Sequence, residues 1–246
     1  MSKANNLFII FGTSRGLGFA LCNYILQFSH NDILAIDRRK LPGISSGRLQ
    51  RTIIDLSKPL SPTAISGLLR SSLLKNYKNL YLINNASLLE PIGPAGKVNT
   101  VELTRLASVN FLNYAVIINE FMRRTKNLRA RKRILNVTSG ASVHPQYGLA
   151  GYCSTKAALE MFGSCIFLEQ QVLNQVEIMS FRPGVINTDM QKKLRESSGA
   201  NFLNNKVHQE LYTKNALLTP EYVAKIMYGT LTARKKWAEP ILDLSI

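Results

Sequence analysis

Acidic residues are scarce in this sequence. Its 246 residues include 15 Asp and Glu against 31 Lys and Arg, which gives a formal net charge of +16. Such an excess of positive charge suits a nucleic-acid partner, an acidic membrane surface or an anionic cofactor. Cysteine is scarcer still, with Cys22, Cys153 and Cys165 widely spaced along the chain. An odd number without a C-x-x-C pair excludes a disulfide framework and a cysteine metal site, and it favours a reducing compartment.

Long hydrophobic runs are also missing. The longest strongly apolar run near the start, Leu7–Phe11, is too short for a membrane span or a signal-peptide core. We therefore expect a cytoplasmic protein that does not associate with membranes. The chain is 46% apolar and 19% charged, which excludes a disordered chain. No internal repeat or low-complexity linker divides it, so we expect one domain over residues 1–246.

Short β-branched runs alternate with longer amphipathic stretches, as in a parallel sheet covered by helices. The predicted strands are Leu7–Phe11, Ile33–Asp37, Arg51–Asp55, Leu80–Asn84, Arg133–Val137, Val176–Phe181 and Ile241–Leu244. The predicted helices are Gly16–Phe28, Pro62–Lys75, Thr100–Arg124, Gly151–Leu173 and Pro220–Thr232. The expected fold class is therefore α/β, with a doubly wound parallel sheet flanked by helices.

Two segments fit neither pattern. Residues 88–99 hold two prolines and two glycines, which predicts a loop after the fourth strand. Residues 183–215 are polar and open with Pro-Gly, which predicts a long loop. Loops of that length in a compact domain are usually functional, so we expect 183–215 to form a substrate loop or lid.

A glycine-rich turn, Gly12-Thr-Ser-Arg-Gly16-Leu-Gly18, follows the first strand directly. Glycine lets a ligand approach the main chain, and the free N–H groups of the next helix attract a pyrophosphate. The spacing is G-x-x-x-G-x-G rather than the common G-x-G-x-x-G. A tight strand-to-helix turn without a ligand is the structural alternative.

The residues around this turn point to different nicotinamide cofactors. Asp37 ends the second strand, 19 residues after Gly18, where a carboxylate accepts hydrogen bonds from a ribose and so favours NAD(H). Arg15 and Arg38 favour NADP(H), because two guanidinium groups would clamp a 2′-phosphate. We favour NADP(H) and keep NAD(H) as the alternative. The segment Arg38–Lys40 as a mere solvated turn is the structural alternative.

A tyrosine and a lysine lie on one face of a predicted helix, in Tyr152-Cys-Ser-Thr-Lys156. A nearby ammonium favours the phenolate, so we expect Lys156 to lower the pKa of Tyr152 toward the useful range for acid–base catalysis. Ser139 ends the fifth strand at the carboxyl edge of the sheet, where ligands bind in such folds. Its hydroxyl would hold a carbonyl oxygen while Tyr152 protonates it.

These motifs, taken in order, resemble the short-chain dehydrogenase/reductase family over nearly the whole chain. The resemblance rests on the glycine turn, Asp55, Asn84-Asn85-Ala86, Asn110, Ser139, Tyr152/Lys156, Pro183-Gly184 and Thr188, with Ser139 the family's usual 13 residues before Tyr152. It implies a Rossmann-type fold and a catalytic set of Asn110, Ser139, Tyr152 and Lys156. It also implies that Asn110 anchors a water in a proton relay through Lys156 to Tyr152.

The resemblance extends to the cofactor site. Asp55 would contact the adenine, Asn85 and Ala86 would line the cleft, and Ile186 and Thr188 would meet the nicotinamide carboxamide. The complete predicted cofactor set is Gly12, Ser14, Arg15, Gly16, Leu17, Gly18, Asp37, Arg38, Asp55, Leu56, Asn85, Ala86, Tyr152, Lys156, Pro183, Gly184, Ile186 and Thr188.

Within the family, the likeness is to sepiapterin-reductase-like carbonyl reductases, especially bacterial benzil reductases that form (S)-benzoin. It implies NADP(H)-dependent reduction of a carbonyl or diketone, benzil-like or pterin-side-chain-like, with Tyr152 as general acid. An NAD(H)-dependent alcohol dehydrogenase is the alternative within the family. Adjacency to Ser139 predicts that Val143, Pro145 and Tyr147 shape the substrate pocket. The helices Thr100–Arg124 and Gly151–Leu173 resemble the pair that builds the family's dimer interface, so we expect a homodimer.

A basic cluster at Arg123–Arg133 offers a function of another class. It has seven basic residues in eleven, enough to neutralise nucleic-acid phosphates. It lacks an aromatic residue for base stacking and lies at the amino end of a strand, so we expect a solvated loop and no specific nucleic-acid binding. His30, His144 and His208 lack ligand spacing, so no metal is expected. A cofactor-binding regulator without catalysis is a third hypothesis, and the intact Ser139, Tyr152 and Lys156 argue against it.

Overall fold

A single parallel sheet organises the chain. The computed structural model describes residues 5–39 and 46–244, and its strands follow the order β3-β2-β1-β4-β5-β6-β7. Their bounds are β1 Asn6–Phe11, β2 Asn31–Asp37, β3 Leu49–Ile53, β4 Asn79–Asn84, β5 Arg131–Val137, β6 Glu177–Arg182 and β7 Ile241–Asp243. Every predicted strand is present, so the doubly wound parallel sheet is confirmed.

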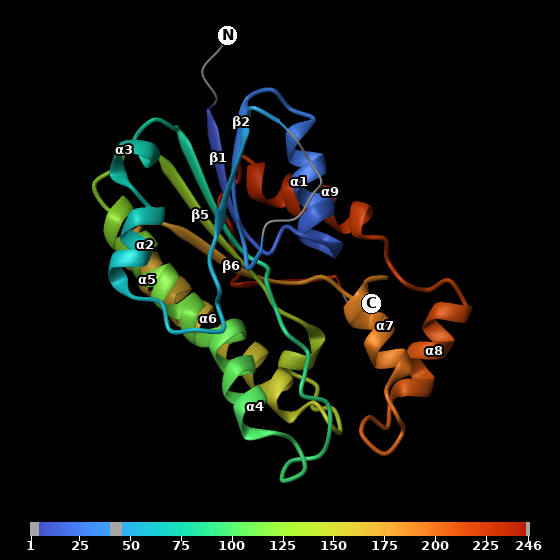
Figure 1. The fold of residues 1–246 in the computed structure, drawn as a ribbon. Helices are drawn as coiled ribbons and strands as arrows, with labels where there is room; N and C mark the ends of the chain where they lie inside the picture. The colour runs from blue at the N-terminus through green and yellow to red at the C-terminus, as the bar shows by residue number, and fades with distance from the viewer. Residues whose placement is uncertain (1–4, 40–45, 245–246) are drawn as a thin grey trace.

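Helices cover both faces of the sheet (Figure 1). Their bounds are α1 Gly16–Leu26, α2 Pro62–Leu68, α3 Ser71–Leu74, α4 Thr100–Ala107, α5 Asn113–Thr125, α6 Ala150–Leu173, α7 Asp189–Glu196, α8 Asn205–Thr213 and α9 Pro220–Thr232. The helices α1 and α9 lie on one face, and α2, α5 and α6 lie on the other (Figure 1).

Strand β1 shows why the fold has two cores. Successive side chains of a strand point to opposite faces of the sheet. Phe8 and Ile10 pack with α1 and α9, whereas Ile9 and Phe11 pack with the other helices, and all four are fully buried. A strand buried on both faces is therefore apolar throughout, and the sequence LFIIF is of this kind.

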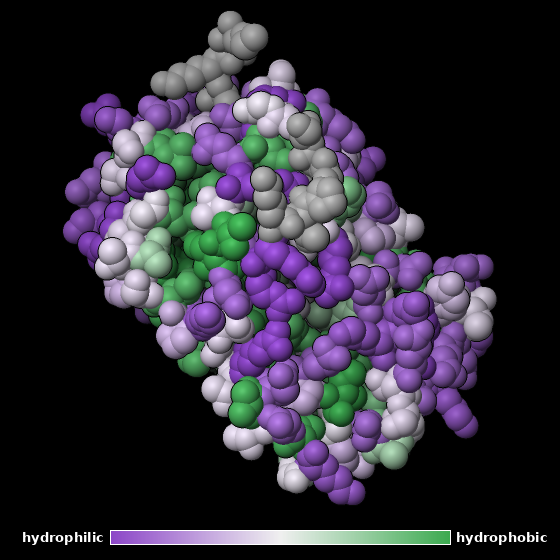
Figure 2. Space-filling model, viewed as in Figure 1, coloured by the Kyte–Doolittle hydropathy of each residue, from purple (hydrophilic) through white to green (hydrophobic). Residues whose placement is uncertain are grey.

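Three predicted segments differ from the structure. The predicted helix 62–75 is two short helices, α2 and α3, because Gly67 and the serine pair at 71–72 are weak helix formers. The predicted helix Thr100–Arg124 contains a π-helical turn, Ser108–Leu112, between α4 and α5. The predicted loop 183–215 contains α7 and α8. Helix α8 buries no residue, so its sequence is polar and lacks the apolar periodicity that predicts a helix. Figure 2 shows mostly hydrophilic side chains over this helix, on the right.

The continuous helical stretch Thr100–Thr125 is, among the described residues, long and apolar enough to cross a membrane by length and composition alone. A core helix passes the same test. Ile117, Ile118 and Phe121 of this stretch are fully buried in the core beside the sheet. We therefore interpret it as a core helix.

The basic cluster 123–133 is largely paired within the fold. Arg123 and Arg124 both bond the carboxylate of Glu120, at 2.8 and 3.3 Å. Arg131 and Arg133 both bond Glu177, at 2.9 and 2.8 Å. These four guanidinium groups form ion pairs with carboxylates of the same chain. The predicted solvated loop is therefore wrong for these arginines, which stabilise the fold.

Candidate active site

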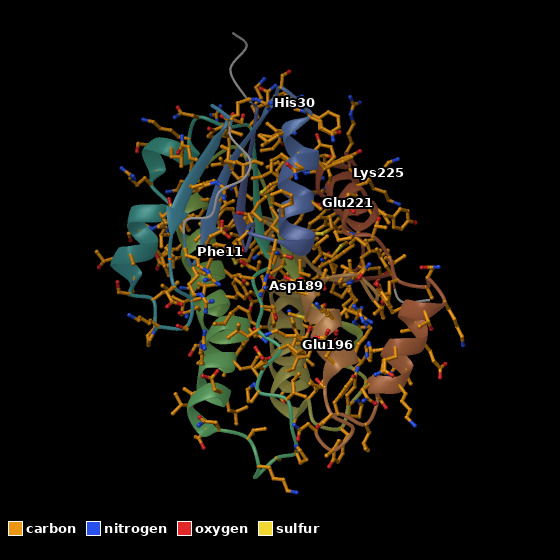
Figure 3. All side chains as sticks on the ribbon, turned by 45° about the vertical axis from the view of Figure 1, so that its right-hand side comes forward. Phe11, His30, Asp189, Glu196, Glu221 and Lys225 are labelled. Atoms are coloured by element: carbon orange, nitrogen blue, oxygen red, sulfur yellow. The ribbon has the colours of Figure 1, made fainter. Side chains whose placement is uncertain are left out.

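A cleft of about 820 Å³ opens at the carboxyl edge of the sheet. At this edge the chain leaves β1, β2, β4, β5 and β6. Figure 3 shows Phe11 at the end of β1 and Asp189 at the start of α7 near one another, whereas His30 lies at the opposite end of the molecule. The predicted site residues that line it are Gly12, Ser14, Arg15, Gly16, Leu17, Asp37, Arg38, Asp55, Leu56, Asn85, Ala86, Ser139, Tyr152, Lys156, Pro183, Gly184, Ile186 and Thr188.

The glycine turn packs too tightly for side chains. Gly12 has φ +83°, and a Cβ there would lie 2.7 Å from the Cα of Ala86. A Cβ on Gly18 would lie 1.9 Å from the carbonyl oxygen of Gly12. The amide of Asn85 donates to that same oxygen at 2.6 Å. Gly18 therefore seats α1 on the turn and does not line the cleft, which corrects its predicted cofactor contact.

The carboxylate of Asp37 is already engaged. It accepts from the backbone N–H of Thr13 at 2.7 Å and from the Thr13 hydroxyl at 2.5 Å. Arg51 also approaches one of its oxygens at 3.4 Å. Asp37 lines the cleft and braces the glycine turn, so its carboxylate has fewer acceptor positions left for a ribose than the sequence suggests. The sequence carried no signal for this, because the pairing joins Asp37 to a residue of the turn 24 positions earlier.

The two predicted phosphate-binding arginines both reach the cleft. Arg15 forms an exposed ion pair with Asp189 at 3.1 Å, which links the glycine turn to the start of α7. Arg38 lies near Asp55. Burial opposes ionisation of the Asp55 carboxyl, but the hydrogen bond from Ser57 and the charges of Arg38 and Lys58 outweigh it and lower the pKa of Asp55.

The serine, tyrosine and lysine predicted to be catalytic all line the cleft at this edge. Tyr152 and Lys156 are 8% and 3% exposed. The Lys156 ammonium donates to the carbonyl oxygen of Val137 at 2.9 Å and lies 5.7 Å from the centre of the Tyr152 ring. Ser139 follows β5, and its hydroxyl oxygen accepts from the N–H of Ala141 at 3.2 Å.

The pKa of Tyr152 differs from the prediction. Burial raises it to about 12, and a hydrogen bond with the Ser139 hydroxyl acts in the opposite direction. The expected lowering by Lys156 is absent because burial lowers the pKa of the lysine itself to about 8, and its ammonium points to a main-chain carbonyl. Tyr152 is therefore a protonated phenol at neutral pH, which suits a proton donor.

Asn110 lies in the π-helical turn and does not line the cleft. Its carboxamide accepts from the N–H of Leu88 at 2.8 Å and donates to the Leu88 carbonyl at 2.9 Å. The Ser87 hydroxyl adds a bond at 3.1 Å. The side chain of Asn110 thus fixes the segment after β4, and π-helical turns of this kind are frequent at functional sites.

The predicted substrate residues Val143, Pro145 and Tyr147 are exposed and lie outside the cleft. Their neighbours His144 and Gln146 line it instead, together with Leu149. The correction is a shift of one residue. This error has a physical reason. The direction of each side chain in an irregular loop depends on the local backbone, and no periodicity in the sequence shows which residues point into the cleft.

Helices α7 and α8 cover this end of the cleft. Phe202, between them, is fully buried in a cluster with Tyr152 and Leu149. The Tyr152 hydroxyl lies 3.8 Å from the sulfur of Met190 on α7. Lys193 of α7 pairs with Glu90 of the 88–99 loop at 2.7 Å. The predicted lid region is therefore packed over the catalytic tyrosine.

No group of three or more His, Cys, Asp or Glu side chains within residues 5–39 and 46–244 is arranged to hold a metal ion.

The chain matches a known protein family over most of its length. Residues 6–199 match the family model described as short chain dehydrogenase. The chain belongs to this family. It is 32% identical over 231 residues to a benzil reductase ((S)-benzoin forming) of Bacillus cereus, covering 91% of this chain and 92% of that protein. A benzil reductase of Bacillus subtilis is 33% identical over 227 residues, covering 92% and 93%. Mouse sepiapterin reductase is a more distant relative, at 28% over 161 residues, covering 63% and 59%.

Solved structures agree on the fold. The KRED1-Pglu enzyme superposes with a TM-score of 0.78 at 25% identity, covering 97% of this chain and all of that one. A 4-hydroxyisoleucine dehydrogenase complexed with NADH gives 0.78 at 21% identity, covering 98% of each chain. A Burkholderia cenocepacia short chain dehydrogenase in complex with NADP gives 0.75 at 18%, covering 99% and 89%. The predicted family and the oxidoreductase class of this chain are confirmed.

Proposed function

We propose that this oxidoreductase is an NADP(H)-dependent carbonyl reductase that converts a 1,2-diketone of the benzil type to the hydroxy ketone. The observation that carries the proposal is the convergence of Ser139, a protonated Tyr152 and Lys156 at the carboxyl edge of the sheet. The benzil reductase relatives, at 32% and 33% identity over most of the chain, support the substrate class.

The site fits a dinucleotide. Gly12 and Gly16 line the cleft without side chains, so the main chain of the turn is open to a ligand there. Helix α1 starts beside that turn, its Arg15 cap residue makes no side-chain capping bond, and no acidic residue lies in its first turn. The helix N-terminus is thus free to bind a pyrophosphate. Asp55 would hold the adenine, Lys156 the nicotinamide ribose, and Ile186 and Thr188 the carboxamide.

NADPH, when bound, supplies a hydride from its nicotinamide ring to the carbonyl carbon. Ser139 donates a hydrogen bond that holds the carbonyl oxygen and polarises it. Tyr152 then delivers the proton to that oxygen, which with the hydride completes the alcohol. Phe202 packs in one apolar cluster with Tyr152, and the Met190 sulfur lies 3.8 Å from the Tyr152 hydroxyl, so the surroundings of the proton donor are largely apolar.

The engaged carboxylate of Asp37 supports NADP(H). Its two oxygens already accept from Thr13 and Arg51. Arg38 and Arg15 both line the cleft, and the exposed ion pair of Arg15 with Asp189 would exchange for a 2′-phosphate. A charged hydrogen bond contributes about 1.5–3 kcal/mol, or roughly 10- to 150-fold in affinity. Fluorescence titration should therefore show NADPH binding weakened about tenfold or more by Arg38→Ala and unchanged by Arg39→Ala, its exposed neighbour.

The test of function combines that titration with turnover. The purified protein is assayed with benzil and with an alcohol substrate, using the preferred cofactor in each direction. Consumption of NADPH on benzil supports the proposal. A clear preference for NADH, with oxidation of alcohols only, would replace it with the alternative dehydrogenase.

We also propose a homodimer formed through the long helices. Leu112 and Val116 of the α4–α5 stretch and Met161 and Leu168 of α6 expose large apolar side chains. Sedimentation should give twice the chain mass, and Leu168→Glu should shift it toward the monomer.

A cytoplasmic, reducing location is proposed because the cysteines are unpaired, with Cys22 fully buried.

A further inference from the structure

A buried carboxylate outside the predicted catalytic set joins the parts of the site. Glu160 lies on α6, four residues after Lys156 and eight after Tyr152, and is 6% exposed. Its Oε2 accepts from the Thr138 hydroxyl at 3.1 Å and from the Ser142 hydroxyl at 3.0 Å. Since Thr138 and Ser142 bracket Ser139, the carboxylate holds the short segment that carries the catalytic serine.

The same carboxylate is paired with Arg182. The guanidinium Nε bonds Oε2 at 3.0 Å, and a second bond joins Nη2 to Oε1. Arg182 is the last residue of β6 and directly precedes Pro183-Gly184 on the cofactor side of the cleft. It also bonds Asp243 of β7 at 2.9 Å. An ionised carboxylate has about four acceptor positions, and four donors reach this one.

Three elements of the active site therefore meet at one side chain. Helix α6 brings Tyr152 and Lys156, the 138–142 segment brings Ser139, and β6 brings the start of the cofactor segment. The carbonyl oxygen of Ser139 is a second acceptor for the single Ser142 O–H, at 2.7 Å, so the serine's own main chain lies beside the cluster. A small displacement of a catalytic hydroxyl costs a large factor in rate, because reaction depends on alignment.

We propose that Glu160 is a positioning residue, whose carboxylate sets the place of the Ser139 hydroxyl relative to Tyr152. The inference rests on the proposed carbonyl reduction, in which Ser139 holds the carbonyl oxygen. A glutamine at 160 has the shape of glutamate, but its NH₂ group cannot accept a bond, and its neutral amide leaves Asp243 as the carboxylate paired with Arg182. The segment around Ser139 then loses part of its anchor.

Strand β6 provides a matched control at its other end. Glu177 is likewise a carboxylate paired with arginine. Glu160 has one arginine partner and two hydroxyl donors, whereas Glu177 has two arginine partners, Arg131 and Arg133, and accepts from the N–H of Trp237 at 2.9 Å. It lies at the start of β6, about 16 Å along the strand from Arg182. Glu160→Gln and Glu177→Gln remove the same chemistry, one beside the catalytic residues and one far from them.

The experiment is a double-mutant cycle with Ser139→Ala, and kcat is expressed per folded enzyme by counting NADPH sites. Glu160→Gln should lower kcat about tenfold or more with Ser139 present and about twofold in the Ser139→Ala background, since coupled residues are not additive. Glu160→Asp should recover part of the loss. Glu177→Gln should lower thermal stability and leave kcat within about twofold. Equal losses in both Ser139 backgrounds, or equal losses in the two glutamine variants, would overturn the inference.

A second measurement needs no substrate. The ¹³Cζ resonance of Tyr152 reports its contact with Ser139, so it should move in Glu160→Gln and stay in place in Glu177→Gln. An unmoved resonance in Glu160→Gln would contradict the inference. A wild-type protein that reduces no diketone would defeat the proposed function alone, and the Tyr152 resonance would still decide the role of Glu160.

Discussion

Strand β6 carries an arginine–carboxylate cluster at each end, and the two clusters do different things. At the amino end, Glu177 gathers Arg131 and Arg133, and Arg133 goes on to bond the carbonyl oxygens of Thr230, Leu231, Ala233 and Lys235. Those carbonyls end α9 and begin the segment toward β7. At the carboxyl end, Glu160 gathers Arg182 and the hydroxyl groups on either side of Ser139.

The two clusters differ in the groups that they bind beyond the arginine–carboxylate pairs themselves. A helix end leaves main-chain carbonyls without partners, and the fully buried guanidinium of Arg133 satisfies several of them. That cluster fixes the fold. The cluster around Glu160 uses hydroxyl donors from a segment that faces the cleft, so it fixes the site. Of the seven basic residues at 123–133, Arg131 and Arg133 belong to the cluster that fixes the fold, and Arg123 and Arg124 pair with Glu120 on α5.

Between the two ends of β6, the larger effect on catalysis is expected at the carboxyl end. Ser139→Ala removes the hydroxyl that would hold the carbonyl oxygen and should lower kcat by about 100- to 1,000-fold, the usual cost of losing one such donor. NADPH affinity should stay within about threefold, because in the proposed mechanism Ser139 would bind the substrate rather than the phosphates. Steady-state kinetics and fluorescence titration measure the two quantities. A near-normal kcat would place the chemistry elsewhere.

At the amino end, Arg133→Met should act on stability. Removing one partner of a buried ion pair costs about 3–5 kcal/mol, because Glu177 and the carbonyls that end α9 lose a donor. The expected result in urea denaturation is a lower free energy of unfolding, with kcat per folded molecule close to wild type. A large fall in kcat with unchanged stability would reverse the roles of the two ends.

The difference in unfolding free energy between Lys156→Met and the wild-type protein is expected to depend on pH. Burial lowers the pKa of Lys156 to about 8 in the folded protein, below the value of about 10.4 in an unfolded chain. Between these values the unfolded chain binds a proton that the folded protein does not, so wild-type stability rises with pH across this window. Methionine does not titrate, so the stability of the variant lacks this contribution to the pH dependence.

The free energy of unfolding of Lys156→Met relative to wild type should therefore be highest at pH 7. It should decline between pH 8 and about 10 by about 1 kcal/mol or less per pH unit. Urea denaturation at several pH values measures it. A difference that stays constant over this range would contradict the lowered pKa of the buried lysine.

The smallest effect is expected in the middle of β6, at Ser180. Its hydroxyl is fully buried and has no hydrogen-bond partner among the described residues. Ser180→Ala should change stability by about 0.5 kcal/mol or less, and in the favourable direction, because it removes an unpaired polar group. A loss above about 2 kcal/mol in calorimetry would indicate a partner for this hydroxyl.

Much of this molecule is readable from its sequence. Apolar runs such as LFIIF predict strands, because burial on both faces of the sheet demands apolar side chains at every position. The glycine turn and the Tyr152/Lys156 pair predict the cleft, because their spacing reflects steric and helical constraints that are local in the chain.

What stayed hidden depends on contacts between distant residues. The binding of Asp37 to Thr13 and the assembly of Glu160 with Arg182 join positions 24 and 22 residues apart, and no periodicity reports them. The polar helices α7 and α8 derive little order from burial, so their sequence looks like a loop. The pKa of Tyr152 depends on the depth of the tyrosine and the direction of the Lys156 ammonium, neither of which spacing defines.

The central claim is that Tyr152 at the carboxyl edge donates the proton in carbonyl reduction, and Tyr152→Phe tests it most directly. Removal of a general acid lowers the rate by about 100- to 10,000-fold. The single-turnover rate of NADPH oxidation by benzil should fall by this factor, while the NADPH affinity of the variant stays close to wild type. A variant that reduces benzil at near the wild-type rate would contradict the account.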